Sequence, residues 1–425
     1  MPGAAASCEV VVVGAGAAGL LAAARSAERG RLTLLLEKNR RPGAKILMSG
    51  GTRCNITQNT DAAGIVEAFG PPGRFLRSAL AALGPADLVA LIEAEGVATK
   101  VEATGKVFPA SDRATDVLAA LLRRLARSGC ELSTEEPCLD LARADRGFRV
   151  VTSKRVLQTE KVILTTGGQS YPGCGTTGDG YAWLAALGHR IVPPRPALTP
   201  VTSGAPWVQS LKGITIPDVV VRAIAGGGKA TGSSRPRAKP ACLAERRGSF
   251  LFTHFGLSGP AVLDVSRAVT AHPRPGELVL ECDFLPALSA DDLDRRLQID
   301  CAAAGKQQLG AIVARYLPRR LADALLETAG LVPAPRAAQL SKRDRARLVA
   351  AVKRTRIPVS GTRGFKKAEV SAGGAALEQI DPRTMQSRIA PNLFIAGEIL
   401  DLDGPIGGYN FQSAFSTAWL AAENV

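Results

Sequence analysis

The N-terminal part of the chain contains a glycine pattern that can bind phosphate groups. Gly14, Gly16 and Gly19 form G-x-G-x-x-G directly after a short apolar run, residues 9–13, and before an Ala/Leu-rich stretch that is predicted to be helical. In that context the first glycine allows a tight turn, the second lets the backbone approach a diphosphate, and the third lets the helix pack on the strand. The phosphates would then lie at the positive end of the helix.

An acidic residue follows at the spacing that a bound dinucleotide requires. A second apolar run, residues 32–36, ends in Glu37, which lies 23 residues after Gly14. A carboxylate in that place accepts hydrogen bonds from ribose hydroxyls and repels a 2′-phosphate. The two strands, the helix and the terminal acid together predict a dinucleotide-binding Rossmann fold.

Later segments indicate that the dinucleotide is FAD. Residues 162–168 read as a buried strand that runs into a glycine turn, and residues 393–398 as another strand that ends in Gly-Glu, which suits hydrogen bonds to a ribityl chain. Residues 403–410 lead into a predicted helix, residues 411–424, whose N-terminal N–H groups can stabilise negative charge on a reduced flavin. Because the chain returns to its first domain after more than 200 residues, the sequence predicts FAD.

A second G-x-G-x-x-G pattern, residues 173–178, lacks the context of a nucleotide site. Tyr171 and Pro172 precede it where a strand is required, and no strand tipped by an acid follows. We interpret it as a loop of the FAD-binding domain. A nicotinamide donor would then reach the flavin without a domain of its own.

Length and composition predict a globular cytoplasmic protein. The 425 residues, 46% of them hydrophobic, suffice for two or three packed domains. The longest apolar stretch, residues 10–24, is broken by glycines and too short to cross a membrane, and the first nine residues contain Glu9 but no Lys or Arg. Eight cysteines without a C-x-x-C pair and only three histidines favour neither a metal site nor a disulfide framework.

The net charge of +15 is concentrated in two segments. Residues 222–247 hold seven Lys/Arg and one acid, and residues 331–367 hold eleven Lys/Arg and one acid. A nearly neutral body with two basic segments indicates a surface that contacts polyanions. A genome rich in G and C explains the choice of Arg over Lys, but not this confinement.

Several further stretches resemble one known family. They are residues 49–55 (SGGTRCN), 166–168 with 178–181, 252–260 (FTHFGLSGP), 372–374 and 397–412. In these stretches the chain resembles, in order and over nearly its whole length, the BaiN/YhiN (RdsA) group of NAD(P)/FAD-dependent oxidoreductases, also called aminoacetone oxidase-like flavoproteins. Thr52 departs from the family, which usually has a third glycine there, and the basic segment 222–247 is also unusual.

The resemblance implies an α/β fold in which a Rossmann-type FAD-binding domain is interrupted by an insert of a small β-barrel plus a helical subdomain. We place the FAD-binding domain at residues 1–195 and 368–425, the barrel at 196–285, the helical part at 286–353, and a return strand or linker at 354–367.

The residue pattern supports such an insert independently. Residues 193–196, Pro-Pro-Arg-Pro, read as a linker, and strand-like runs follow at 219–224, 249–253 and 278–282. Ser289 and Ser341 are predicted helix N-caps.

The residues predicted to bind FAD come from the glycine turn, the end of the second strand, the family's loop and the later glycine-rich stretches. They are Gly14, Gly16, Ala17, Ala18, Gly19, Glu37, Lys38, Lys45, Ser49, Gly50, Gly51, Arg53, Asn55, Cys138, Thr166, Gly167, Gly168, Gly397, Glu398, Asp403, Gly407, Gly408, Tyr409 and Asn410.

The resemblance also suggests a reaction, because the YhiN/RdsA branch is associated with dihydrouridine formation in large-subunit ribosomal RNA. The hypothesis is NAD(P)H-dependent reduction of the uracil C5–C6 double bond, in which a protein acid supplies one proton. Cys54, with its thiolate stabilised by Arg53, and His254 are the candidate catalytic residues. Tyr171 can stack on a base, although 19 aromatic residues leave no RNA platform of the usual kind.

Other functions remain open at this stage. A small-molecule flavin reductase or oxidase would act on a steroid-like enoyl group or an amine in an apolar pocket. A non-catalytic FAD-containing RNA-binding protein is the third possibility. Ribosomal RNA is the expected partner, through segments 222–247 and 331–367, without DNA specificity; the oligomeric state and the choice between NADH and NADPH stay undetermined.

Overall fold

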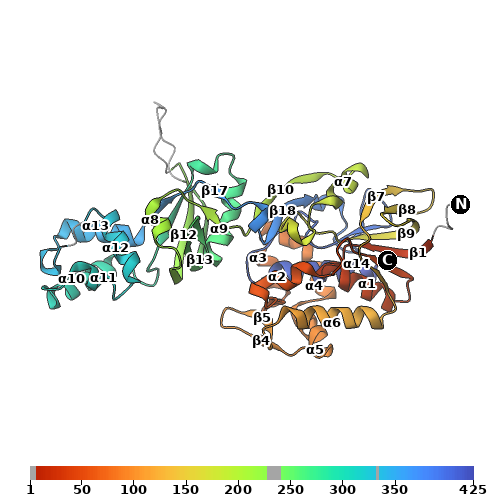
Figure 1. Cartoon of the computed structure of the whole chain (residues 1–425), viewed down its shortest axis with the longest axis horizontal. Coiled ribbons are helices and arrows are strands. Elements are labelled where there is room, and N and C mark those ends of the chain that lie inside the picture. The colour runs from red at the N-terminus through yellow and green to blue at the C-terminus, as the bar shows by residue number, and fades with distance from the viewer. Residues whose placement is uncertain (1–5, 227–240, 332–334) are drawn as a thin grey trace. The chain divides into compact units, whose positions relative to one another are not determined.

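The computed structural model of the chain describes residues 6–226, 241–331 and 335–425. Its contacts divide the chain into two compact units, whose elements are labelled in Figure 1. The first unit comprises Met1–Pro196 and Phe365–Val425, and the second comprises Ala197–Gly364. The first unit is therefore formed from both ends of the sequence.

A seven-stranded sheet lies at the centre of the first unit, in the order β6-β2-β1-β9-β8-β7, with β19 beside β9. The strands are β1 Ala6–Val13, β2 Thr33–Leu36, β6 Glu131–Ser133, β7 Cys138–Arg143, β8 Phe148–Thr152, β9 Val156–Leu164 and β19 Leu393–Ile395. β1 pairs in parallel with β2 and β9, and β19 pairs in parallel with the end of β9. Residues 10–13 are all valine and at most 4% exposed, as expected for a parallel strand covered on both faces.

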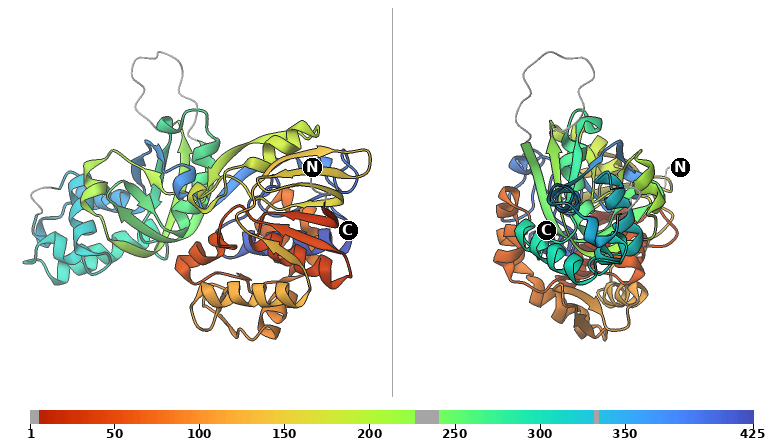
Figure 2. Two further views of the ribbon diagram at one scale, coloured as in Figure 1. Left: turned by 45° about the vertical axis from the view of Figure 1, so that its right-hand side comes forward. Right: turned by 90° about the vertical axis from the view of Figure 1, so that its left-hand side faces the viewer.

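Helices cover this sheet and bring the two chain ends together. They are α1 Ala17–Glu28, α2 Ala44–Thr52, α3 Ala62–Ala68, α4 Arg77–Ala82, α5 Pro85–Ala94, α6 Ala114–Arg127, α7 Asp179–Ala186 and α14 Tyr409–Glu423. α1 packs against both α6 and α14, so the red and blue ends of the chain in Figure 2 share one core. Two small sheets complete the unit: β3 Thr57–Gln58, β4 Thr99–Val101 and β5 Lys106–Pro109 form one, and β10 Ile191–Ala197 and β18 Val370–Ala375 the other.

The second unit contains a curled sheet in the order β16-β15-β12-β13-β14-β11-β17. Its strands are β11 Val201–Thr202, β12 Thr215–Ala225, β13 Ala241–Thr253, β14 Gly256–Ser258, β15 Val279–Asp283, β16 Thr355–Pro358 and β17 Gly361–Thr362. The consecutive strands β16 and β17 pair with β15 and β11 respectively, so residues 355–362 link the two ends of the sheet and close a small barrel. Phe250, Phe252 and Phe284 fill its core.

Six helices accompany this barrel. They are α8 Pro206–Ser210, α9 Pro260–Ala271, α10 Ala290–Ala303, α11 Leu309–Val313, α12 Arg319–Thr328 and α13 Lys342–Lys353 within the described residues. Ser289 caps α10 by accepting a bond from the Asp292 N–H, and Ser341 caps α13 by accepting from the Asp344 N–H. Both predicted N-caps are confirmed.

Two local predictions need correction. Residues 193–196 were expected to form a linker but belong to β10, which pairs with β18. A two-stranded sheet has only edge strands, and there a proline without an N–H is tolerated. β13 begins at Ala241, eight residues before the predicted 249. The prediction missed the first half of the strand because that half is exposed and carries no apolar alternation.

As for membrane spans, none of the described helices alone has the length and hydrophobicity to cross a bilayer. One pair, Pro71–Ala82 with Pro85–Ala94, passes that test together but is bent by 43°.

Candidate functional site

The first glycine turn joins β1 to α1 at the centre of the sheet. The Gly14 N–H donates to the Leu36 carbonyl at 2.8 Å, and the Thr165 N–H donates to the Val13 carbonyl at 3.0 Å. A Cβ on Gly19 would lie 1.8 Å from the Gly14 carbonyl oxygen, whereas one on Gly16 would meet no heavy atom within 4 Å. The turn is therefore closed on its protein side and open at Gly16, where a diphosphate can approach.

The start of α1 offers N–H donors to such a group. Gly16 is the N-cap residue and has no side chain with which to satisfy the first-turn N–H groups of Ala17, Ala18 and Gly19. N–H groups in that place have no partner within the helix and attract anions.

Glu37 lies beside this turn, at the end of β2. Its carboxylate accepts from the Ala15 N–H at 2.9 Å and from the backbone and side-chain nitrogens of Asn39 at 2.8 Å each. The side chain is nearly buried, at 7% exposure. It is held in the position from which a carboxylate binds a ribose in Rossmann folds.

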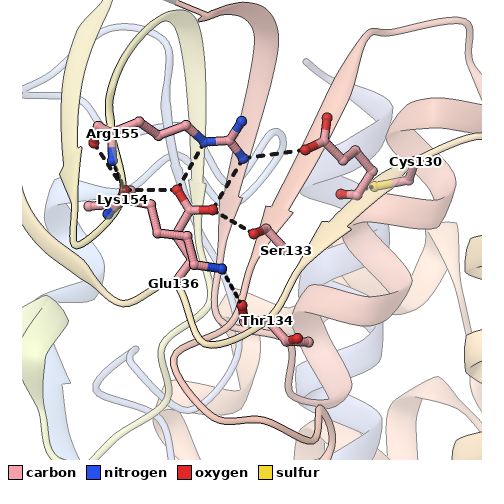
Figure 3. A network of polar contacts seen from close by, with 8 residues as sticks. Cys130, Ser133, Thr134, Glu136, Lys154 and Arg155 are labelled. Carbon is pink, nitrogen blue, oxygen red and sulfur yellow. Dashed lines mark hydrogen bonds and ion pairs between the residues drawn. The ribbon is translucent and has the colours of Figure 1, made fainter.

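A buried network behind Glu37 fixes that strand end, and no motif in the sequence indicates it. The Glu136 N–H donates to the Glu37 carbonyl at 2.9 Å. The Glu136 carboxylate, fully buried, accepts from Arg155 Nε at 3.0 Å, Ser133 Oγ at 2.5 Å and Thr152 Oγ1 at 2.8 Å (Figure 3). Burial alone would raise the pKa of Glu136, but the bonds from Arg155, Ser133 and Thr152 outweigh it and lower the pKa.

The second glycine-rich segment, residues 173–178, packs onto the residues that follow Glu37. Lys38 Nζ contacts Asp179 Oδ2 at 2.6 Å and Thr177 Oγ1 at 2.7 Å, and Asn39 Nδ2 donates to the Cys174 carbonyl at 3.1 Å. The pattern begins inside a single 3-10 turn, Pro172–Cys174, and not after a strand. The segment is a loop of the first unit, and Lys38 anchors it.

A second polar cluster surrounds Glu398, which follows β19. Its carboxylate accepts from Ser170 Oγ at 2.6 Å and from the Ser371 N–H at 2.9 Å, and Lys45 Nζ contacts both Glu398 and Ser170. Ser371 Oγ in turn accepts from the Gln169 N–H at 2.8 Å. The cluster holds the glycine turn after β9 against Gly397 and Glu398; Ser170 and Ser371 were not predicted.

The predicted flavin-side loop interrupts α2. Its helical geometry breaks at Ser49, Gly50 and Gly51, and Thr52 also has a positive φ of 70°. Threonine rarely adopts that conformation, so Thr52 strains the loop at a position where a glycine would not.

Cys54 and Arg53 do not form the expected pair. Arg53 contacts Glu102 at 2.6 Å and lies over the Phe108 ring at 4.0 Å. Cys54 is 1% exposed, and burial raises the pKa of its thiol to about 12, opposed only by a hydrogen bond with Ser49. The expectation that Arg53 stabilises a Cys54 thiolate is therefore wrong, because its guanidinium is engaged elsewhere.

Two buried polar atoms near these loops lack partners among the described residues. They are Asn55 Oδ1 and Thr166 Oγ1. A buried polar atom without a partner is costly, so the Asn55 oxygen is suited to a bound group that donates a hydrogen bond, and the Thr166 hydroxyl to one that donates or accepts. Together with the open space at Gly16, this is the arrangement expected of a cofactor site.

The loop before α14 is shaped by its own side chains. Asn410 Oδ1 accepts from the Gly404 N–H at 2.8 Å, and Asn410 Nδ2 donates to the Gly404 carbonyl at 3.0 Å. Gly408 caps α14 and packs on Thr57, since an added Cβ would lie 2.5 Å from the Thr57 backbone. Thr57 and Gln58 therefore pack against residues 407–412 at the start of α14, where the sequence predicts an isoalloxazine site built from both chain ends.

The remaining predicted residues lie as follows. Gly167, Gly168, Asp403 and Gly407 lie in loops of the first unit, and Tyr409 is the first residue of α14. Cys138 begins β7 and is half-buried; burial raises its pKa to about 12. His254 lies in the second unit, exposed in the turn between β13 and β14.

Ion pairs with carboxylates neutralise several of the Lys and Arg side chains in the two basic segments. Residues 227–240 and 332–334 lie outside the described residues. Arg222 pairs with Glu245 at 2.5 Å, and Arg247 pairs with Asp218 at 2.7 Å. In the second segment the pairs are Arg345–Asp294, Arg347–Asp344, Lys353–Asp283 and Arg356–Glu281. Lys342, Arg343, Arg354 and Arg363 stay exposed.

Comparison with known proteins agrees with this geometry. Residues 8–424 match the family described as HI0933-like protein Rossmann domain. The chain belongs to this family. It is thus a flavin-dependent oxidoreductase of the predicted α/β fold, and the resemblance seen in its sequence is confirmed.

Three curated relatives align over nearly the whole chain. The ribosomal RNA dihydrouridine synthase of Escherichia coli K12 is 33% identical over 98% of both chains, and that of Haemophilus influenzae is 31% identical over 98% of both. The 3-dehydro-bile acid delta(4,6)-reductase of Clostridium scindens is 29% identical over 96% of this chain and 97% of its own.

Proposed function

We propose that this HI0933-like protein uses NAD(P)H and bound FAD to reduce the C5–C6 double bond of a uridine in large-subunit ribosomal RNA. The observation that carries the proposal is the end-to-end 33% identity with the E. coli ribosomal RNA dihydrouridine synthase. The exposed cations Lys342, Arg343 and Arg354 support it, because unpaired Lys and Arg can neutralise RNA phosphates. A cytoplasmic location, where ribosomes are, is part of the proposal.

The proposed reaction balances without a further reactant. NAD(P)H, a proton and uridine give NAD(P)⁺ and dihydrouridine, with the hydride added to one ring carbon and the proton to the other. Bound FAD supplies the relay of the hydride from the nicotinamide to the base. The chain itself holds FAD, through the Gly16 turn, Glu37 and the start of α14, and supplies the proton.

His254 is the stronger of the two candidate proton donors. The thiol of Cys54 is buried, and an acid whose pKa is raised to about 12 donates its proton slowly near neutral pH. His254 is exposed and accessible to a large substrate. We therefore expect His254→Gln to slow product formation more than Cys54→Ala, with FAD content equal in both variants.

The decisive experiment uses ribosomal RNA that lacks the modification. The protein is purified with its flavin spectrum recorded, incubated with this RNA and either NADPH or NADH, and the RNA fragments are weighed by mass spectrometry. We expect a gain of two hydrogens at one uridine, and RNA binding that weakens steeply with salt. An unchanged RNA mass with both donors would refute the proposal that ribosomal RNA is the substrate.

The relation to the bile acid reductase favours a second candidate, reduction of a steroid-like enone. The same protein and donors would be incubated with a 3-keto steroid that carries a conjugated double bond. Loss of the enone absorbance, with RNA unchanged, would support this candidate over the first.

A further inference from the structure

A small cluster of aromatic and cationic groups lies on the barrel of the second unit. The turn between β13 and β14 carries His254 and Phe255, whose ring centroids lie 5.0 Å apart with an interplanar angle of 80°. The guanidinium of Arg363, which follows β17, lies 4.6 Å from the centre of the Phe255 ring. His254 and Arg363 are exposed and Phe255 is half-buried, so the cluster faces solvent within its own unit.

The barrel fixes the backbone on both sides of this cluster. β11 pairs with β14 on one side and with β17 on the other. At the two ends of β11 the Ser203 N–H donates to the Phe255 carbonyl at 3.1 Å, and the Arg363 N–H donates to the Pro200 carbonyl at 3.0 Å.

The turn itself needs a glycine. Gly256 has a φ of +142°, and a Cβ there would lie 2.4 Å from the Val201 carbonyl oxygen. The three side chains therefore project from a closed hydrogen-bonded frame, which lowers the entropy lost when they bind a ligand.

Arg363 differs from the other arginines that lie over aromatic rings in the described part of the chain. Arg25 and Arg124, over Trp419, pair with Glu423 and Glu28 respectively. Arg53, over Phe108, pairs with Glu102. No carboxylate pairs with Arg363 among the described residues, so its charge is left for an external anion.

We propose that His254, Phe255 and Arg363 form a stacking site for an unpaired nucleobase of an RNA, with Arg363 also facing the phosphate chain. Aromatic rings and guanidinium planes are the groups on which proteins stack splayed RNA bases, and every base presents a flat face to them. The inference rests on the proposed RNA substrate and identifies where the second unit contacts it. The sequence did not reveal this platform, because Phe255 and Arg363 are 108 positions apart.

The test separates base stacking from attraction to phosphate, and needs neither turnover nor an electron donor. Binding of the FAD-loaded protein is measured by fluorescence anisotropy with a ten-nucleotide oligouridylate and with an abasic ribose-phosphate chain of equal length. Wild type should bind the oligouridylate roughly 10-fold more tightly than the abasic chain, the size expected for stacking of one or two bases.

Four variants and one control locate the effect. Phe255→Leu and Arg363→Gln should abolish the preference for bases, whereas Phe255→Trp should keep it. Arg363→Lys should weaken the preference but keep binding to the abasic chain, since the charge remains while the plane is lost. The control, Arg274→Gln, removes an exposed arginine outside both basic segments and should leave the preference for bases unchanged. Melting temperatures verify that each variant folds.

Equal binding of the two chains by wild type, or a preference that survives Phe255→Leu, would overturn the inference. If a variant lowers the melting temperature but keeps the preference for bases, the contacts only stabilise the turn. That result would also overturn the inference. If the base preference is present but no dihydrouridine forms, the stacking site stands and the proposed reaction fails.

Discussion

Two segments of the first unit share the pattern G-x-G-x-x-G, residues 14–19 and 173–178, and the structure uses them differently. At the first, the third glycine, Gly19, presses on backbone: a Cβ would lie 1.8 Å from the Gly14 carbonyl oxygen. At the second, Cβ atoms on Gly175 and Gly178 would meet the side chains of Asn39 and Gln169, which can move. The first pattern brings a helix onto a strand, whereas the second only shapes a loop.

The difference shows that the surrounding elements, and not the glycines, give the pattern its meaning. The first segment follows the buried strand β1 and starts a 12-residue helix. The second begins inside one 3-10 turn and is anchored to Lys38 and Asn39 from the strand end that carries Glu37. One segment forms the tight turn between β1 and α1, and the other packs against Lys38 and Asn39, which follow Glu37.

The largest effect is expected at Gly19. Gly19→Ala forces a methyl group into the Gly14 carbonyl, and neither backbone can move without separating α1 from β1. We expect a loss of about 3 kcal/mol or more in the free energy of unfolding, measured by urea denaturation.

Gly173→Ala is the matched control for the second pattern. Its added Cβ would meet no atom within 4 Å. A change within about 0.5 kcal/mol is expected. Equal effects of the two substitutions would remove the distinction between the segments.

The sequence sufficed for the fold wherever local chemistry dictates structure. The glycine turn and the Ser289 and Ser341 caps form because the interacting groups are close in sequence. The valine run identifies β1 as a buried strand from its own residues, although its partner β9 is distant in sequence. The sequence failed at residues 193–196, where β10 exists because β18, nearly 180 residues later, pairs with it. No local pattern reports a partner at that separation.

The candidate site follows the same rule. The residues predicted around Gly14 and Glu37 do meet, since strand order in a Rossmann fold is regular. Glu136, Ser170 and Ser371 went unnoticed because their importance arises from tertiary contacts. Cys54 looked reactive from its neighbour Arg53, but the chain turns that guanidinium toward Glu102.

The next effect concerns the support behind Glu37. Glu136→Gln removes the buried carboxylate that holds Arg155 and should cost about 2 kcal/mol at pH 7. Because the pKa of Glu136 lies below the ordinary 4.5, the stabilisation is complete above that pH and is lost as the pH falls through the folded-state pKa. The free energies of unfolding of wild type and variant, measured with urea, should therefore become equal in acid.

The control for this prediction is Glu131→Gln. Glu131 contacts the same Arg155 at 3.3 Å but is 65% exposed. It should change stability by less than about 0.5 kcal/mol. If the difference in unfolding free energy between wild type and Glu136→Gln stays constant down to pH 3, then the shape of the Glu136 side chain, and not its charge, supports the strand end at Glu37.

A third substitution separates folding from cofactor binding. Gly16→Ala places a methyl group in open space, so the melting temperature of the FAD-free protein should not change. The same methyl group would occupy the approach of the diphosphate to α1, and FAD affinity, measured by flavin fluorescence, should fall at least about 10-fold, or 1.4 kcal/mol. Unchanged affinity would mean that the diphosphate lies elsewhere.

The smallest effect tests the anchor of the second segment. Lys38→Met breaks the contact with Asp179, but both side chains are about one-third exposed, at 30% and 42%, so the cost should be only about 0.2–1 kcal/mol and should shrink in high salt. Arg40→Met, at an exposed arginine two positions away, should cost nothing measurable. Asn39 also holds the loop, so the loss of Lys38 should loosen it only locally. Limited proteolysis within residues 173–178 should detect this better than global unfolding does. A large global loss would instead mean that the loop is part of the nucleotide turn, and that the two patterns are less separate than their contacts indicate.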